Sequence, residues 1–271
     1  MSEKPAASDT ELDLPPRIVW EHDGREMILV ARTTFRIGRD DSRPNESPSH
    51  LVTIKPFYID RYPVTHAEYH RFVQFTNQAI PCYHVEWIDT EEYNWDPETG
   101  TPPSDKVDHP VVQVSWEDAR AYSEWAQKRL PTEAEWECAA RGVDERRWPW
   151  GNEFGRGRCN TLESNIGRTT AVYRFSPQGD GYEGVGDLIG NVWEWTSSLY
   201  WPYPYDADDG REGLQARGWR VLRGGSWLND LTIASATARL DGDFIFFTNI
   251  GFRCAVSADV VNKVLQHCSQ P

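Results

Sequence analysis

The stretch GDLIGNVWEW, at residues 186–195, decides the fold of this chain. Two later stretches share its character, RVLRGGSW at residues 220–227 and NIGFRCA at residues 249–255. Tryptophan and glycine at this density predict tight backbone turns packed under large rings, rather than one amphipathic helix. The first stretch contains no catalytic cluster.

Several oxygen donors lie close together in this first stretch. Asp187, Asn191 and Glu194 supply side-chain oxygens, while Gly186 and Gly190 allow nearby carbonyl groups to turn inward. Hard cations such as calcium bind to mixtures of carboxylate and carbonyl oxygens. The same residues also fit a buried turn whose polar groups satisfy only one another. The spacing leaves both interpretations open.

Further motifs extend the pattern toward the N-terminus. RLPTEAEWECAARG occupies residues 129–142, and MILV, FRIG and FYIDRYPVTHAEYHRF follow one another between residues 27 and 72. Together with GNVWEW, RGGSW and NIGFRCA, this order resembles the formylglycine-generating enzyme (sulfatase-modifying factor) family. The resemblance runs from Gly24 to Val256 and implies a single C-type-lectin-like α+β domain with much irregular structure.

Length and charge limit the classes of partner. A chain of 271 residues is most simply one large domain, and its 13 tryptophans suggest rings that hold irregular loops in place. A net charge of -14 predicts a field that repels nucleic acid and anionic membranes. Because MSEKPAASDTELDLPP lacks an apolar signal core, and no long apolar stretch follows, we expect a cytoplasmic protein.

Local signals predict the order of the elements. We expect a disordered acidic arm at residues 1–16, the folded domain at 17–258 and a short C-terminal tail at 259–271. Alternating apolar residues predict strands at 26–37 and 51–59, on either side of a polar loop. Capping boxes predict helices that begin near Thr65, Ser115 and Thr132.

Two histidines stand at zinc-ligand spacing in the first predicted helix. His66 and His70 are four residues apart, but Ala67 occupies the position at which the zincin pattern requires glutamate. We interpret them as packing histidines, with metal ligation as the alternative.

The resemblance implies calcium sites. In the family's second site, the pattern N/D-x-x-G-N-V/A-W-E places the carbonyls of Gly190 and Val192 with the carboxylates of Asp187 and Glu194. In the first site, Asn160 matches the family's asparagine ligand, whereas the acidic residue that follows in the family is replaced here near position 164 or 165. We therefore expect a structural calcium ion at the second site.

The resemblance also shows what this chain lacks. The family's oxidases bind copper through a cysteine pair between the RGGSW and GFR motifs, since thiolates are soft ligands that hold Cu(I). Residues 228–249 contain no cysteine, and the expected positions fall near Asn229 and Leu231. Cys254 belongs to the GFRCA motif and is not part of that pair. We expect no copper and no formylglycine formation, which leaves enzymatic activity uncertain and favours a non-enzymatic role.

The same interval is rich in apolar residues, including the run FIFF at 244–247. Exposed apolar side chains on a rigid fold are typical of binding surfaces, although FIFF fits a buried strand equally well. We predict a non-oxidase binding or accessory protein whose 227–249 face binds a protein or peptide partner. The candidate ligand-binding residues are Trp227, Asn229, Leu231, Arg239, Phe244, Phe246 and Phe247.

Three further hypotheses follow from resemblance. The variable proteins of diversity-generating retroelements are similar in placing diversified residues between these two motifs. The chain is equally consistent with a subunit of a larger complex. The alternative in another class is a metal-dependent oxidoreductase, like the sulfoxide synthases, with a metal site that contains no cysteine. This chain lacks the HxxxHxE signature that supplies their iron ligands.

Overall fold

The three motifs that opened the sequence analysis form neighbouring strands of one sheet. The computed structural model describes residues 14–84, 89–181, 183–242 and 248–268. In it, β6 (Trp193–Leu199) lies between β7 (Arg220–Arg223) and β9 (Ile250–Phe252), and β8 (Arg239–Asp241) completes the order β8-β7-β6-β9. β6 runs antiparallel to β7 and parallel to β9, so segments far apart in sequence meet at one end of this sheet.

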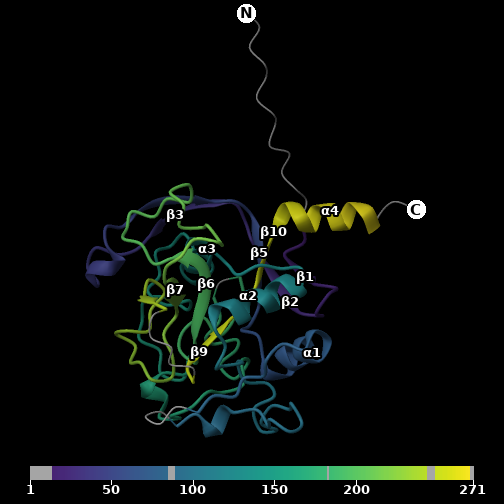
Figure 1. Cartoon of the computed structure of the whole chain (residues 1–271). Coiled ribbons are helices and arrows are strands. Elements are labelled where there is room, and N and C mark those ends of the chain that lie inside the picture. The colour runs from purple at the N-terminus through teal and green to yellow at the C-terminus, as the bar shows by residue number, and fades with distance from the viewer. Residues whose placement is uncertain (1–13, 85–88, 182, 243–247, 269–271) are drawn as a thin grey trace, which may run out of the picture.

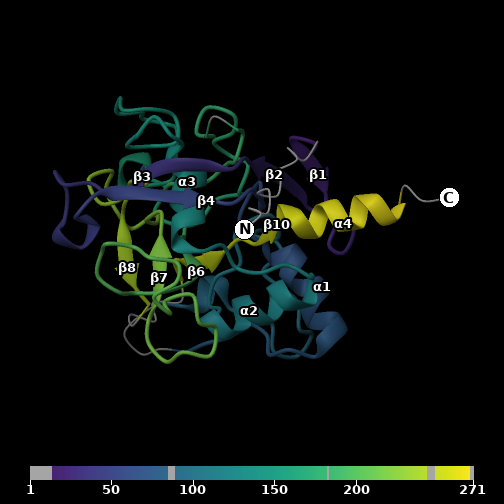
Figure 2. The ribbon, with the colours of Figure 1, turned by 90° about the horizontal axis from the view of Figure 1, so that it is seen from above.

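A second sheet joins the two ends of the domain. Its order is β1 (Arg17–Val19), β2 (Glu26–Val30), β5 (Phe57–Asp60) and β10 (Ala255–Ser257), with every pair antiparallel. The helix α4 (Ala258–Cys268) follows β10 directly and projects from the body of the domain (Figures 1 and 2).

The two long strands that the sequence predicted are each broken into two. β3 (Thr33–Ile37) and β4 (His50–Ile54) pair with one another in a separate ribbon, whereas β2 and β5 belong to the second sheet. Pro56 lies at one of these breaks and has no backbone N–H to donate to a ladder. The apolar alternation changes phase at each break, between Val30 and Phe35 and between Ile54 and Phe57, and the prediction of two long strands did not take this shift into account.

The predicted helix starts are confirmed. α1 (His66–Thr76), α2 (Trp116–Trp125) and α3 (Glu133–Arg141) begin directly after Thr65, Ser115 and Thr132. In each, the N-cap hydroxyl accepts a hydrogen bond from the third helical amide, and that residue's carboxylate accepts one from the N-cap amide. Three short 3-10 helices occupy Pro44–Glu46, Glu91–Tyr93 and Leu162–Ser164.

Aromatic rings fill the space between these elements. Tyr69 of α1 stacks on Tyr122 of α2 with ring centres 5.9 Å apart, and Phe252 of β9 packs edge-on against Tyr122 at 5.3 Å. These rings tie two helices to the sheet that carries the motifs. The α+β fold class is thus confirmed, and no helix among the described residues is long and apolar enough to span a membrane.

Candidate functional site

A tight turn follows β7 at the position where the family's copper ligands begin. Gly224 and Gly225 have φ angles of 96° and 79°, and a Cβ on Gly225 would come within 2.6 Å of the Ala234 Cβ. The turn closes through Asn229, whose Oδ1 accepts hydrogen bonds from the Ser226 amide and hydroxyl, both at 2.9 Å. An amide that caps a turn therefore stands where a cysteine was expected.

Asn249 and Trp227 border this turn and carry unpaired polar atoms. The Asn249 Nδ2 donates to the Ser226 hydroxyl at 3.0 Å, while its Oδ1 is buried without a hydrogen-bond partner among the described residues. The Trp227 Nε1 is likewise buried and unpaired within the described part of the chain. Leu228, between them, is 46% exposed. We call Ser226, Trp227, Leu228, Asn229 and Asn249 the Trp227 corner.

The candidate calcium ligands lie directly behind this corner. The Asn191 carbonyl accepts from the Trp227 amide at 3.1 Å, and the Asn191 amide donates to the Asn160 carbonyl at 2.7 Å. The Asn191 Nδ2 donates to the Asp187 carboxylate at 2.7 Å. Asn160 and Gly190 form an isolated β-bridge. The structure thus brings Asn160, Asp187 and Gly190 together and connects them to the Trp227 corner through Asn191.

Asp187 is a buried carboxyl whose charge is poorly compensated. It is 8% exposed, and burial raises its pKa to about 8, although the hydrogen bond from Asn191 acts in the opposite direction. Among the described residues it forms no ion pair. A cation would stabilise its ionised form.

Glu194, one of the predicted calcium ligands, is ion-paired with Arg253. Its two oxygens accept hydrogen bonds from the Arg253 guanidinium, both at 2.7 Å, and the Trp136 indole donates to one of them at 2.7 Å. Glu194 is 1% exposed. The predicted four-residue calcium set therefore fits only in part, because Glu194 is held by Arg253 while Asp187 remains available.

The predicted ligand-binding residues divide into three groups. Trp227 and Asn229 lie in the Trp227 corner. Leu231 is 3% exposed within the core, and Arg239 is 2% exposed, with its guanidinium bound to the Glu133 carboxylate. These two side chains are not available to a partner in this conformation. Phe244, Phe246 and Phe247 lie outside the described residues.

Three thiols are buried in the core. Burial raises the pKa of Cys138 and of Cys159 to about 12, and it raises the pKa of Cys254 as well. Within the described residues, no three His, Cys, Asp or Glu side chains come together in a metal-binding cluster.

His66 is a packing residue. It is fully buried, and its Nδ1 accepts a hydrogen bond from the Trp95 indole at 2.9 Å. Burial lowers the pKa of His66 to about 3, so the ring is neutral at neutral pH. His70 packs edge-on against the same indole at 5.5 Å between ring centres.

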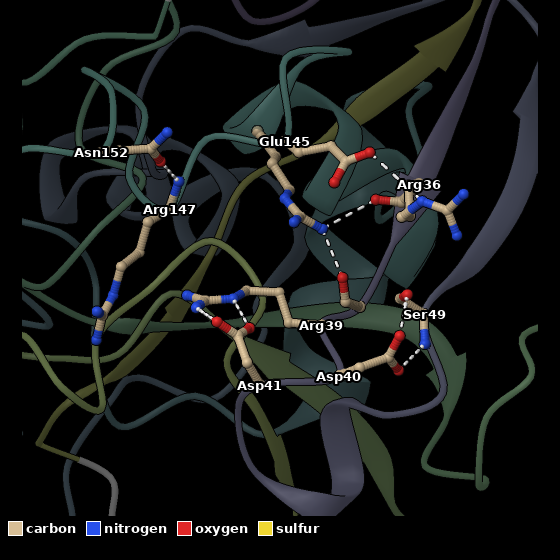
Figure 3. A pocket seen from close by; sticks show the side chains of 10 residues that line it. Arg36, Arg39, Asp40, Asp41, Ser49, Glu145, Arg147 and Asn152 are labelled. Atoms are coloured by element: carbon tan, nitrogen blue, oxygen red, sulfur yellow. Dashed lines mark hydrogen bonds and ion pairs between the residues drawn. The ribbon is translucent and has the colours of Figure 1, made fainter.

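A polar cavity of about 500 Å³ lies between the β3-β4 ribbon and the segment after α3 (Figure 3). Its charged groups are largely paired with one another. Arg39 binds Asp41 through two hydrogen bonds of 2.8 Å, and Arg36 lies 3.4 Å from Glu145. Arg141 donates to the Gly38 carbonyl at 2.6 Å. We assign no function to this cavity.

The fold and the position of the motifs define a sulfatase-modifying-factor type of domain. The sequence profile of the FGE-sulfatase family, the sulfatase-modifying factor enzyme 1-like domain, matches residues 17–258, and the chain belongs to this family. The resemblance noted in the sequence is therefore confirmed.

Curated relatives include both active and inactive members. The formylglycine-generating enzyme of Thermomonospora curvata is 33% identical over 302 residues, covering 90% of this chain and 97% of the relative. The inactive C-alpha-formylglycine-generating enzyme 2 of Bos taurus is 34% identical over 279 residues, covering 86% and 88%. Because the two identities are nearly equal, overall similarity does not decide between activity and its absence.

Solved structures agree on the fold. PvdO from Pseudomonas aeruginosa has a TM-score of 0.73 at 25% identity, covering 89% of this chain and 97% of that chain. Treponema denticola variable protein 1 has a TM-score of 0.64 at 19% identity, covering 86% and 95%. The second likeness concerns the fold alone.

Proposed function

We propose that this protein is a non-oxidase binding or accessory protein, and that its 227–249 face binds a protein or peptide partner. One observation carries the proposal. Asn229 stands where a copper-binding cysteine was expected, and its side chain closes the turn with Ser226. Residues 228–249 contain no cysteine. The turn thus keeps its shape without the chemistry of the oxidases.

The exposed side chain of the Trp227 corner supports binding of a partner. Leu228 is 46% exposed, and exposed apolar side chains on a rigid fold are typical of binding surfaces. The unpaired Asn249 Oδ1 and Trp227 Nε1 are buried, so a ligand would reach them only after side chains of the corner moved.

A structural calcium ion is part of the proposal. Asp187 would ligate it together with the carbonyl groups of Gly190 and Val192, and Asn160 lies close enough to support this corner through the bridge to Gly190. Glu194 would remain with Arg253. The ion would hold the loops behind the Trp227 corner in place and take no part in chemistry.

Two finer possibilities remain proposals. The likeness to a variable protein supports a diversified binding face on the 227–249 segment, and a subunit role in a larger complex is equally compatible with it. From the net charge of -14, we also expect a cytoplasmic protein without nucleic-acid or membrane partners.

Site-specific photo-crosslinking tests the proposal. A benzophenone amino acid replaces Leu228 in the native host, and a second strain carries it at Leu51, an exposed position on β4. We expect one defined protein to crosslink at 228 and not at 51.

In parallel, the purified protein is incubated with copper and a Cys-x-Pro-x-Arg peptide. Copper-dependent conversion of the cysteine, or oxygen consumption with another metal, would overturn the proposal in favour of an enzyme.

A further inference from the structure

A second cavity, of about 520 Å³, lies beside α2. It is bounded by the first turn of that helix, by β6 and by the loop that precedes β7, and Figures 1 and 2 both show α2 beside β6. Arg220, the first residue of β7, lines the cavity, whereas Trp227 follows the other end of that strand. We call it the Trp116 groove, after its residues Trp116, Arg120, Trp195, Arg217, Trp219 and Arg220.

Two of its three indole rings are fixed. Trp116 is 8% exposed and donates through Nε1 to the Thr196 carbonyl at 2.9 Å. Trp195 is 4% exposed and donates through Nε1 to the Val114 carbonyl at 3.1 Å. Because both N–H groups are already paired within the protein, these rings offer apolar and π surface rather than a hydrogen bond.

Arg220 holds the loop that forms one wall. Its guanidinium lies 4.1 Å above the centre of the Trp116 ring. It donates to the Ser197 carbonyl at 2.6 Å and to three carbonyls of the loop, those of Gly213, Leu214 and Ala216, at 3.0, 3.2 and 3.1 Å. The wall is therefore set before any ligand binds, which lowers the entropic cost of binding.

Two further groups of the groove are exposed to solvent. Trp219 is 55% exposed, and Arg217 is exposed and makes no hydrogen bond or ion pair with any residue that the structure describes. Arg120, whose guanidinium lies 5.6 Å from the Trp116 ring centre, is already ion-paired with Glu124 at 3.1 Å. Arg217 is therefore a cation with which an anionic group of a ligand can pair.

This chemistry selects an anion that carries an apolar or aromatic group. The N-terminus of a helix is a common binding site for phosphate. At the N-terminus of α2, however, the Asp118 carboxylate already accepts a hydrogen bond from the Ser115 amide at 3.0 Å, and its negative charge would repel a phosphate. A carboxylate can instead pair with Arg217, away from that terminus. Residues 214–219 are all exposed, and their backbone can accompany an extended chain.

We propose that the Trp116 groove binds an acidic peptide segment that carries an aromatic side chain. One of its carboxylates pairs with Arg217, and its ring packs against Trp219 over the fixed Trp116 indole. This site is independent of the Trp227 corner.

Fluorescence anisotropy with a labelled peptide Asp-Glu-Phe-Asp-Glu tests this assignment on the full chain. We expect binding at least about tenfold tighter than that of Lys-Lys-Phe-Lys-Lys, with Asp-Glu-Ala-Asp-Glu in between, and affinity that falls with salt. The variants Arg217→Glu and Trp219→Ala should each weaken binding about tenfold or more. Both side chains are exposed, so their thermal unfolding should match that of the unmodified protein.

A matched control comes from the loop after α3, where Phe154 and Arg156 repeat the same spacing of an exposed ring and an exposed arginine. Phe154→Ala and Arg156→Glu should leave affinity within about twofold. Equal affinity for the acidic and basic peptides, or equal losses in the two pairs of variants, would overturn the assignment. If ATP displaced the peptide at a concentration at which free glutamate has no effect, the groove would be a nucleotide site and not a peptide site.

Discussion

Two regions meet at the Arg223 end of β7 and differ in how their polar groups are paired. Toward α3, three buried glutamates meet three buried arginines, in the pairs Glu133–Arg239, Glu137–Arg223 and Glu194–Arg253. At the Trp227 corner, polar atoms of Trp227 and Asn249 are buried without partners among the described residues. Ion-paired carboxylates give the first region a fixed geometry, while the second carries the exposed Leu228 side chain. The same end of β7 thus borders both a scaffold and a candidate binding surface.

Breaking a scaffold pair should give the largest effect. Arg253→Met removes the partner of a glutamate that is 1% exposed, and an uncompensated buried charge costs about 3–5 kcal/mol. We expect a loss of that order in the free energy of unfolding, measured with urea. Arg36→Ala, which breaks a pair in which both side chains are largely exposed, should change it by less than about 1 kcal/mol. Similar values for the two variants would contradict the contrast between the regions.

Unpaired buried atoms also occur away from the Trp227 corner, since the His66 Nε2 is buried without a hydrogen-bond partner among the described residues and this ring packs in the core. Its pKa is about 3 when folded against an ordinary 6.5, so only the unfolded state gains a proton as the pH falls between these values. Stability is therefore complete above pH 6.5 and falls below it, by roughly 2–3 kcal/mol at pH 4.5.

The variant His66→Asn keeps an acceptor for the Trp95 indole but does not titrate. Urea unfolding of both proteins between pH 7 and pH 4.5 should show a difference in stability that shrinks by about 2–3 kcal/mol. Parallel pH profiles would show that His66 is not held neutral in the fold.

Sequence reasoning succeeded where the signal was local. The capping boxes at Thr65, Ser115 and Thr132 predicted their helices because cap and helix are adjacent in the chain. Family motifs supplied the α+β fold. Contacts across the chain were not predictable in the same way: Arg253 reaches Glu194 over 59 residues, and nothing in the GNVWEW stretch shows that this carboxylate is already paired.

The candidate site was predicted in part for the same reason. The motif spacing placed the expected copper positions near Asn229 and Leu231, and only the structure shows that Asn229 closes a turn. Hydrophobicity alone could not distinguish exposed Leu228 from buried Leu231. Arg239 resembles a surface cation in the sequence and is buried because Glu133, on α3, compensates its charge. Asn249 was present in a quoted motif, and only the structure shows its contact with Ser226.

Calcium should have a smaller effect, confined to the loops behind the Trp227 corner. An ion at tenfold its dissociation constant stabilises the fold by about 1.4 kcal/mol. Chelation should therefore lower the melting temperature of the unmodified protein, and calcium should restore it. Asp187→Asn removes the uncompensated carboxyl and should abolish this response. Melting curves that superimpose with chelator and with calcium would leave Asp187 in a hydrogen-bonded turn without an ion.

The smallest effect on stability should come from a substitution in the Trp227 corner. Such a variant can lose binding while it keeps its fold, so it separates the two properties. Leu228 is 46% exposed, and Leu228→Ser should change the free energy of unfolding by less than about 0.5 kcal/mol. The same change removes the exposed apolar contact of the corner and should weaken capture of the crosslinked partner about tenfold, measured by quantitative mass spectrometry of the affinity-purified protein. Leu51→Ser, at a position that is 63% exposed on β4, gives the matched control, in which both stability and capture should persist. Equal capture by the two variants would move the partner's contact away from this face. A large loss of stability in Leu228→Ser would instead place this side chain in the scaffold, and the contrast between the ion-paired region and the Trp227 corner would then fail.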